Sequence, residues 1–412
     1  MSSKRLDVAI VVAVALLSNF AYLKFSNGDY YFPDSFTYLT PARAMLHGAG
    51  FVDALGRPET LRTPAYPLLL AAFGAHAVPV LVFQHLLNIA LAVAIYFFVM
   101  SRAASRLAAL AGALYFAMDP PTVHYANKVL TETLFTVFLF VLFIAALQKR
   151  AIASGVLIGV LILIRPIALF FWIPLFAIWP RKWGQMAALV ALSLALPLAW
   201  AARNRIETGA FTVSPIGTFN LLEHRAAAAL AIEDGGDDFK KDLADEQKGL
   251  EDDVNATMQD ALQVDRPERL PPSTRARFYT RPALRVLAQH PVAVVEMSVR
   301  GTFINLFDSD WDAIADVTTI SPEVVKWGLN AVPVIVFVLA IVGTIGAWRT
   351  HRALAILLVI TVGYFVVISS GSEAEARFRV PVVPQLAIAA ALGVDAIRRG
   401  VKSEASGQKA EV

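Results

Sequence analysis

The sequence contains no cysteine, and only 17% of its 412 residues are charged. The absence of cysteine excludes disulfides, thiolate catalysis and cysteine-ligated metals. The seven histidines are scattered and show no His-x-x-His or His-Glu-x-x-His spacing. The sequence therefore names no metal-ligating residues and requires no cofactor, and it leaves open whether a divalent metal held by acids is used. The net charge of +3 is small, and its placement along the chain matters more than its size. Nucleic acid is not among the expected partners.

The sequence is instead rich in apolar residues, which make up 57% of the chain. A soluble domain cannot hide so much apolar surface, so the composition predicts a polytopic membrane protein in contact with membrane lipids. A membrane span needs roughly 20 apolar residues. The candidate spans are residues 6–25, 77–100, 103–118, 130–147, 185–201, 327–347, 352–370 and 378–397.

The positive-inside rule predicts the topology. The basic clusters placed on the cytoplasmic side are Lys4/Arg5, Arg102/Arg106, Lys149/Arg150, Arg181/Lys182, Arg349/Arg352 and Arg398/Arg399/Lys402. Two of these clusters flank the apolar segment 152–179, which is broken at Arg165-Pro166 and is predicted to be a hairpin of two short helices. The expected fold is all-α, with about ten transmembrane helices and both termini cytoplasmic. The first span is expected to be a retained anchor rather than a cleaved signal peptide.

This topology divides the chain into four parts. Residues 1–201 form an N-terminal transmembrane module that contains a first outer loop, 26–76. Residues 202–326 form a long extracytoplasmic loop or small helical domain, whose acidic middle indicates a solvated helical excursion or a partly disordered insert. Residues 327–400 supply the C-terminal transmembrane helices, and 401–412 form a disordered tail.

The first outer loop has a distinct local pattern. The sequence PDS at 33–35 marks a helix start, and helical spacing of apolar residues predicts an amphipathic surface helix over 35–47. Gly48 and Gly50 would end this helix. The following FVDALGRPETLR reads as a turn-rich hairpin, and the prolines of TPAYP start a second apolar helix.

Short motifs of this loop stand in a characteristic order: DSFTYL at 34–39, GAGF at 48–51 and TPAYP at 63–67. They resemble the first outer loop of the GT-C glycosyltransferases of the protein-mannosyltransferase-like group, which includes lipid A aminoarabinose transferases. Four later segments resemble others of that family: VLTETLFTVFLF (129–140), GVLIGVLILIRPIAL (155–169), WAARNRIETGAF (200–211) and ARFRVPVVPQLAIAAALG (376–393). The acidic insert within 225–285 has no counterpart there.

The resemblance implies an integral-membrane glycosyltransferase. Such an enzyme takes a hexose or pentose from a polyprenyl-phosphate donor and passes it to a hydroxyl of a glycan, lipid or protein acceptor. The reaction would occur at the extracytoplasmic face of a membrane, expected to be the bacterial inner (plasma) membrane. The acceptor hydroxyl needs a base and the leaving phosphate needs cations. Direct attack would invert the anomeric centre.

The resemblance makes Asp34 the candidate general base, although position alone favours a helix cap. Glu132 is the second candidate catalytic acid, because an ionisable group just inside a span is costly and usually functional. The alternative for Glu132 is an i,i+4 pair with Lys128. Asp53 and Asp119 are weaker candidates, for which turn or cap roles are expected.

The family pattern makes Arg377 and Arg379 candidates for binding the donor phosphate, with snorkelling as the alternative. Arg165 needs an anionic partner, either the donor phosphate or an internal carboxylate. Arg203 is expected to anchor the long loop. The possible substrate-binding residues of the first loop are Tyr38, Arg43, Asp53, Arg62 and Tyr66.

Two other functions fit a polytopic membrane protein. A transporter or lipid-linked glycan flippase would show internal repeats and paired broken helices. The sequence shows one broken hairpin without a counterpart. A polymerase or ligase of polyprenyl-diphosphate glycans would show a different set of arginines. The sequence specifies neither the sugar nor the acceptor, and we expect acceptor choice to reside in 202–326.

Overall fold

The computed structural model describes residues 3–26, 28–103, 105–179, 182–236, 238–311 and 321–408. Arg181, residues 312–320 and the end of the tail, 409–412, lie outside the described part. Within it, every regular element is helical, and the only β pairing is an isolated bridge between Val52 and Pro58. The all-α prediction is confirmed.

Five helices are long and apolar enough to cross a membrane. They are α1 (Ser3–Phe25), α4 (Ala77–Met100), α9 (Trp183–Thr208), α16 (Pro322–Thr350) and α18 (Val383–Gln408). The shorter apolar helices are α5 (Arg106–Met118), α7 (Glu132–Leu147), α8 (Ala151–Ile164) and α17 (Arg352–Ile368). The chain is thus an integral membrane protein, while the predicted number of about ten spans stays a prediction.

Residues 152–179 show the predicted break but not the predicted pair of helices. After α8 the chain returns through two 3-10 turns, Pro166–Ala168 and Pro174–Ile178. The end of this segment lies beside the start of α8, because the indole nitrogen of Trp179 donates to the carbonyl oxygen of Lys149 at 3.3 Å. A proline inside an α-helix removes a hydrogen bond and clashes with the preceding turn, so the second arm does not form an α-helix.

Glycine sets the crossing of α16 and α18. A Cβ on Gly343 would lie 1.9 Å from the carbonyl oxygen of Ala389, and one on Gly393 would lie 2.1 Å from that of Leu339. Small residues let membrane helices approach closely enough for their backbones to touch. This contact fixes α18, and with it the 3-10 turn Ala376–Val382 that directly precedes α18.

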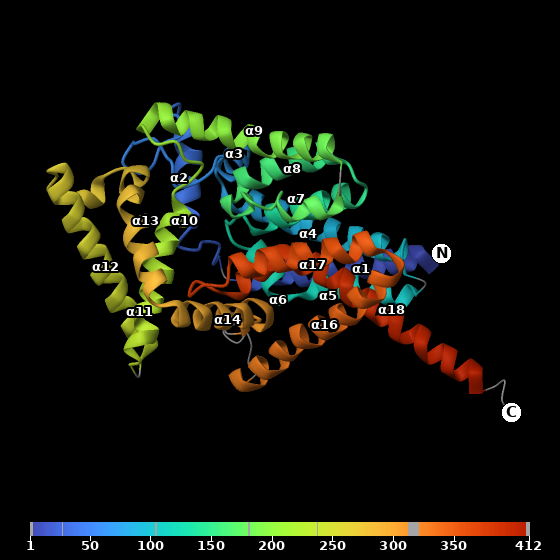
Figure 1. Cartoon of the computed structure of the whole chain (residues 1–412). Helices are drawn as coiled ribbons and strands as arrows, with labels where there is room; N and C mark the ends of the chain where they lie inside the picture. Colours follow the sequence, from blue (N-terminus) through green and yellow to red (C-terminus); the bar gives the residue numbers. More distant parts are fainter. Residues whose placement is uncertain are drawn as a thin grey trace.

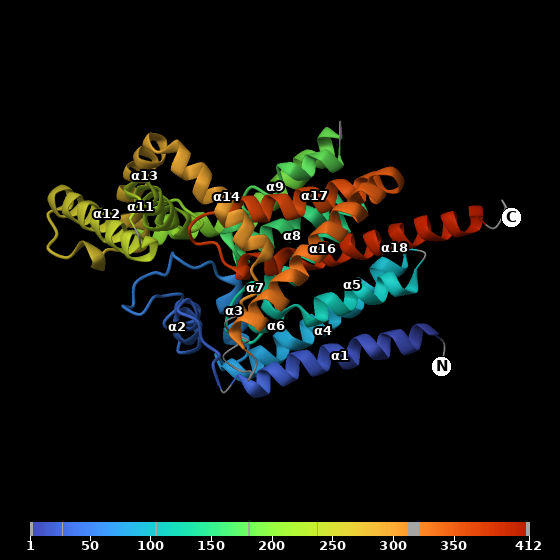
Figure 2. The same cartoon turned by 90° about the horizontal axis from the view of Figure 1, so that it is seen from below.

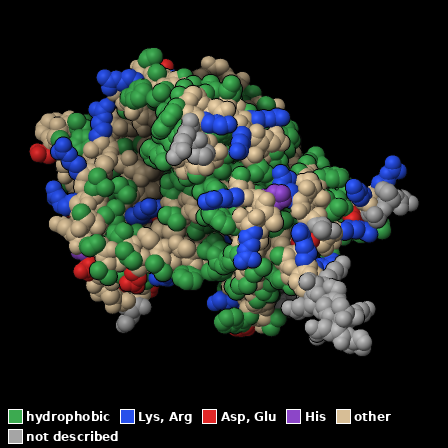
Figure 3. Space-filling view, turned by 45° about the vertical axis from the view of Figure 1, so that its right-hand side comes forward, with side chains coloured by type: hydrophobic (Ala, Val, Ile, Leu, Met, Phe, Trp, Pro, Cys, Tyr) green, Lys and Arg blue, Asp and Glu red, His purple; other side chains and the backbone are tan. Residues whose placement is uncertain are grey.

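Both termini lie at one end of the molecule (Figure 1). Arg106 forms an ion pair with Asp7 there, and Arg398 Nη1 donates to Ser105 Oγ at 3.0 Å. Figure 3 faces this end and shows many Lys and Arg side chains around a largely hydrophobic surface. Arg106 and Arg398, from two of the predicted cytoplasmic clusters, thus lie at the same end of the molecule as the start of α1, while the orientation in the membrane stays a prediction.

Helices of the first outer loop lie at the opposite end (Figure 2). They are α2 (Ser35–Leu46) and α3 (Ala65–Ala72), and a short helix, α6 (Pro120–Ala126), follows α5. Gly48 and Gly50 adopt positive φ angles of 75° and 81° directly after α2. Both predicted helices of this loop, and the glycine stop between them, are confirmed.

The segment after α9 is helical and has its own core. Its elements are α10 (Ile216–Phe219), a π-helical turn (Asn220–Ala226), α11 (Ala227–Asp234), α12 (Phe239–Leu262), α13 (Pro272–Gln289) and α14 (Pro291–Phe307). Buried side chains from the π-helical turn, α12 and α13 pack together, among them Leu222, Met258 and Tyr279. The acidic middle of 202–326 is thus a packed helical unit with one solvated face, and it is not disordered.

The C-terminal tail also differs from the prediction. α18 continues to Gln408, whereas a disordered tail was expected from residue 401. The sequence VKSEASGQ contains no proline, so nothing in it forces the helix to stop.

Candidate active site

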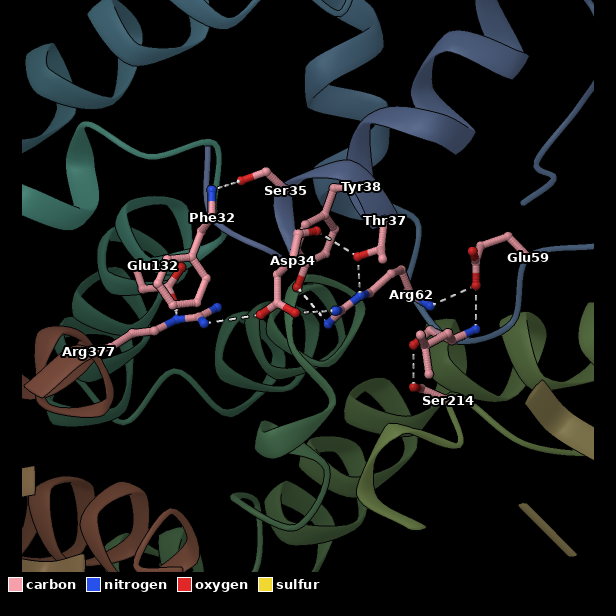
Figure 4. A network of polar contacts seen from close by, with 11 residues as sticks. Phe32, Asp34, Ser35, Thr37, Tyr38, Glu59, Arg62, Glu132, Ser214 and Arg377 are labelled. Carbon is pink, nitrogen blue, oxygen red and sulfur yellow. Dashed lines mark hydrogen bonds and ion pairs between the residues drawn. The ribbon is translucent and has the colours of Figure 1, made fainter. Parts of the chain in front are cut away.

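Five charged side chains from distant parts of the sequence meet at the end opposite the termini. Asp34 precedes α2, Arg62 lies before α3, Glu132 begins α7, Arg165 follows α8, and Arg377 lies in the turn before α18. Figure 4 shows Asp34 between Arg62 and Arg377, with Glu132 behind Arg377. We call these five residues the acid–arginine cluster.

A continuous chain of ion pairs links the cluster. Asp34 accepts at Oδ1 from Arg62 Nη2 at 2.7 Å and at Oδ2 from Arg377 Nη1 at 3.1 Å. Arg377 also donates from Nε to Glu132 Oε1, and Arg165 Nη1 donates to the same oxygen at 2.9 Å. Glu132 Oε2 is buried and has no hydrogen-bond partner among the described residues. Arg377 is therefore the bridge between the two acids.

The cluster runs from a buried interior to an accessible edge. The side chain of Glu132 is 0% exposed and that of Arg377 is 7% exposed. Arg62 and Arg165 are 12% and 13% exposed, while Asp34 is 33% exposed. Asp34 is therefore the most accessible member of the cluster.

The cluster carries excess positive charge, because three guanidinium groups face two carboxylates. Burial raises the pKa of Asp34, but the guanidinium groups of Arg62 and Arg377 outweigh burial and hold this pKa below its usual value. Asp34 therefore stays ionised at neutral pH. In the described part of the chain, no three His, Asp or Glu residues are grouped so as to hold a metal ion.

The geometry excludes one local alternative for each of the two acids. The Asp34 side chain forms no capping hydrogen bond with α2, and the Thr37 hydroxyl instead donates to the Asp34 carbonyl at 2.6 Å. Lys128 forms an ion pair with Asp29 at 2.5 Å, not with Glu132. The helix-cap and i,i+4 interpretations are both wrong, and each carboxylate faces the arginines.

Aromatic rings hold two of the arginines in place. The Tyr38 hydroxyl accepts from Arg62 Nη1 at 3.2 Å, and the guanidinium carbon of Arg62 lies 4.7 Å from the centre of the Tyr38 ring. The guanidinium of Arg377 lies 5.0 Å from the centre of the Phe32 ring. Cations are attracted to ring faces at such distances. Tyr38 thus packs against Arg62 of the cluster, and the predicted substrate contacts of both residues stay predictions.

Three other predicted residues of the first loop lie outside the cluster. Tyr66 is fully buried and donates its hydroxyl to Gln84 Oε1 at 2.9 Å. Asp53 forms an ion pair with Arg57 at 2.6 Å across a turn. Arg43 is exposed on α2. The contacts of Tyr66 and Asp53 stabilise the loop itself, and a substrate contact by any of the three stays a prediction.

Arg379 points away from Arg377, although only two residues separate them. Its side chain is 1% exposed and donates to the carbonyl oxygens of Leu306 and Asp308 at 2.9 and 2.6 Å. Its third partner is Asp119, at 3.7 Å. Arg379 thus holds the end of α14, and its predicted contact with phosphate stays a prediction.

Arg203 anchors the first loop rather than the long one. It donates to the carbonyl oxygens of Phe51 and Glu59 at 3.0 and 2.8 Å. These bonds tie the turn that precedes Arg62 to α9. Arg203 thus contributes to the position of Arg62 through the backbone.

Glu375 is an acid near the site that the sequence analysis did not select. It reaches solvent at the start of the turn that carries Arg377. The surrounding protein nevertheless excludes enough water to raise the pKa of Glu375 above its usual value. The positive charge of Arg377 acts in the opposite direction but does not outweigh this effect. In the sequence, the feature that could have indicated Glu375 is its position two residues before Arg377, a predicted site residue.

An apolar pocket of about 560 Å³ opens between α14 and α16. Its lining includes four aromatic residues, Phe303, Phe307, Trp311 and Trp327. Asp308 also lines it, and the Asp308 carbonyl is one of the two that accept from Arg379. The pocket therefore adjoins the segment that carries Arg377.

The fold of the chain is similar to that of a solved oligosaccharyltransferase, which agrees with the resemblance at the level of fold alone. The oligosaccharyltransferase from Archaeoglobus fulgidus, solved in the apo form, matches with a TM-score of 0.50 and 11% identity. The match covers 98% of this chain but only 51% of that protein, so the chain spans about half its length.

A second solved structure is ArnT from Cupriavidus metallidurans bound to undecaprenyl phosphate. It matches with a TM-score of 0.41 and 13% identity, over 95% of this chain and 78% of ArnT. That similarity is too weak to support an argument about this chain. No family model and no curated protein sequence matches the chain.

Proposed function

We propose that the chain is a glycosyltransferase that moves a sugar from a polyprenyl-phosphate donor to an acceptor hydroxyl. The observation that carries this proposal is the acid–arginine cluster, with an ionised Asp34 at its accessible edge and positive charge in excess. A base and a set of cations at one place are what glycosyl transfer from a phosphate requires.

The donor phosphate would bind the arginines of the cluster. Guanidinium groups match phosphate oxygens in geometry and charge. Arg62 and Arg377 both form ion pairs with Asp34, which lies at the accessible edge of the cluster. A phosphate that binds Arg377 Nη1 offsets the excess positive charge and releases Asp34 Oδ2 from its ion pair. Donor binding would therefore free the base.

The isoprenoid tail of the donor would occupy the apolar pocket between α14 and α16. A flexible hydrocarbon chain gains free energy by burying its surface against aromatic side chains. The pocket meets the turn that carries Arg377 where Arg379 donates to the Asp308 carbonyl, so the phosphate end of the lipid would point toward Arg377.

Asp34 would act as the general base in a direct displacement. The acceptor oxygen forms a bond with the anomeric carbon as the bond between that carbon and the phosphate oxygen breaks. The hydroxyl proton passes to Asp34, and the leaving phosphate keeps the electron pair, stabilised by the arginines. Attack from the side opposite the phosphate inverts the anomeric centre.

Glu132 would position the arginines without contacting the acceptor. It is fully buried behind Arg377 and holds both Arg377 and Arg165 through one oxygen. A fixed carboxylate there orients the guanidinium groups before the substrate arrives, which reduces the reorganisation needed in the transition state.

The enzyme would reside in the bacterial inner membrane with both termini in the cytoplasm. The basic end that carries the termini supports this orientation, because cytoplasmic segments are enriched in Lys and Arg. The cluster, at the opposite end, would then face the extracytoplasmic side, where polyprenyl-linked sugars are used.

A transfer assay with the full chain in detergent tests the proposal. The donors are polyprenyl phosphates that carry different hexoses or pentoses, with nucleotide sugars as controls. We expect transfer from at least one lipid donor, none from nucleotide sugars, and a product with inverted anomeric configuration. Retained configuration would contradict direct displacement. Movement of intact lipid-linked sugar across vesicles, without cleavage, would instead show a transporter.

A further inference from the structure

A second pocket lies apart from the acid–arginine cluster, where the end of α9 meets α13. Its volume is about 260 Å³. Its polar lining consists of two arginines and four hydroxyl residues: Arg205, Arg277, Thr212, Thr218, Ser273 and Thr280. Among the described residues, no acidic side chain lines it. We call it the α9–α13 pocket.

The two arginines converge on a single backbone oxygen. Arg205 Nη1 and Arg277 Nη2 both donate to the carbonyl of Gly209, the latter at 3.2 Å. Neither arginine forms an ion pair with a described residue, whereas Arg62 and Arg377 of the cluster both pair with the carboxylate of Asp34. Two like charges held together without an acid repel each other, and an anion between them relieves that repulsion.

Hydroxyl groups complete a set of donors suited to an oxyanion. Thr212 and Thr218 line the pocket with hydroxyls that form no hydrogen bond to any described residue. A hydroxyl can donate one hydrogen bond and a guanidinium several. The two guanidinium groups and the hydroxyls of Thr212 and Thr218 can thus donate hydrogen bonds to an anionic ligand.

The pocket is connected to the candidate active site through the first loop. Ser214 lies between two lining residues, Thr212 and Pro215, and its hydroxyl donates to the carbonyl of Leu61 at 2.6 Å. Leu61 directly precedes Arg62, the partner of Asp34. Figure 4 shows Ser214 beside the segment that leads to Arg62. Figure 1 shows α9 and α16 on opposite sides of the molecule, so this pocket lies away from the proposed lipid path.

We propose that the α9–α13 pocket binds a phosphate or carboxylate group of the acceptor, an inference that rests on the proposed glycosyl transfer. It selects acceptors that carry such a group at a distance from the reacting hydroxyl. The donor phosphate binds the cluster, and the acceptor anion binds this second site.

The first test is arginine footprinting, which needs no turnover. The full chain in detergent is treated with phenylglyoxal with and without inorganic phosphate, at constant ionic strength to keep screening equal. Mass spectrometry then measures labelling at each arginine. We expect phosphate to reduce the labelling of Arg205 and Arg277 by more than half. Arg285, exposed on the same helix as Arg277 and outside the pocket, is the internal control.

Equal labelling of Arg205 and Arg277 with and without phosphate would overturn the inference. That result would leave these arginines as cations that only stabilise the carboxyl end of α9. An equal reduction at Arg285 would likewise show that phosphate acts non-specifically.

The second test compares two acceptors that differ only in one anionic group. Arg277→Gln should raise KM for the anionic acceptor about tenfold, the loss typical of one charge-assisted hydrogen bond. Its kcat, and the KM for the neutral acceptor, should not change. Arg285→Gln should change neither KM. An equal effect of Arg277→Gln on both acceptors would contradict anion recognition. If the wild-type chain transfers sugar to no acceptor, the proposed function fails, and the footprint alone decides whether the pocket binds an anion.

Discussion

Glu132→Gln tests how the acid–arginine cluster is held together. Glu132 is 0% exposed and accepts hydrogen bonds from Arg165 and Arg377. The variant leaves three guanidinium groups against Asp34 alone. Removing one partner of a buried ion pair costs about 3–5 kcal/mol, because the remaining charge stays buried without compensation. We expect the free energy of unfolding to fall by an amount in this range.

Arg377→Gln should cost less, although Arg377 contacts both acids. Without it, two complete pairs remain, Arg62 with Asp34 and Arg165 with Glu132, and the cluster becomes neutral. The expected loss is about 1.5–3 kcal/mol, the value of hydrogen bonds to charged groups. The double variant should lose less than the sum of the two single variants, because the two residues interact directly.

Equilibrium unfolding in mixed detergent micelles measures these differences. Glu268→Gln, at an exposed position outside the cluster, is the matched control and should change stability by less than about 0.5 kcal/mol. A larger loss for Arg377→Gln than for Glu132→Gln would refute the reasoning. So would additive losses in the double variant.

Two further predictions concern the base and the helix packing. Burial raises the pKa of Asp34, but the positive charges of Arg62 and Arg377 lower it by more, so the net pKa lies below its usual value. Arg62→Gln removes one of these charges and should move the acid limb of the pH–rate profile to higher pH. Because the folded pKa is depressed, the stability contributed by Asp34 is present above its unfolded pKa of about 3.9 and is lost as pH falls through the folded pKa. A pH–rate profile that is identical for wild type and Arg62→Gln would contradict the assigned cause. Gly393→Ala should lower the thermal unfolding midpoint by several degrees, because the added Cβ would lie 2.1 Å from the carbonyl oxygen of Leu339. Gly363→Ala on α17, with nothing within 4 Å, is its control, and an equal loss in both would contradict the proposed close packing.

The sequence predicted the helices best where one local pattern sufficed. Long apolar runs correctly predicted the long membrane helices. In the first loop, the apolar spacing before Gly48 and the prolines after Gly50 correctly predicted two helices. The acidic insert was harder, yet its signal was present. Leu250, Val254 and Met258 recur at four-residue spacing on α12 and pack against the small core of that unit. High overall charge obscured this narrow apolar stripe.

The site was predicted as separate residues and not as a cluster. Asp34 and Arg377 are 343 positions apart, and Glu132 and Arg377 are 245 apart. No local pattern encodes such contacts, which depend on how the helices pack. The sequence also treated Arg377 and Arg379 alike. In a 3-10 turn of three residues per turn, side chains two positions apart point in different directions, and only Arg377 reaches the cluster.

The return arm of the hairpin shows how proline limits such predictions. The charges around 152–179 correctly indicated a reversal of the chain. They contained no information about backbone conformation in the second arm, where two prolines favour 3-10 turns over an α-helix.

The most direct test of the central claim is the transfer rate of Asp34→Asn. Asparagine keeps the shape of the side chain but cannot accept the acceptor proton, so kcat should fall by about 10²–10⁴-fold. Asp252→Asn, the same substitution at an exposed position on α12, should retain the wild-type rate. Folding of both variants is checked by their thermal unfolding midpoints. A folded Asp34→Asn variant that transfers sugar at the wild-type rate would contradict the role of Asp34 as the base.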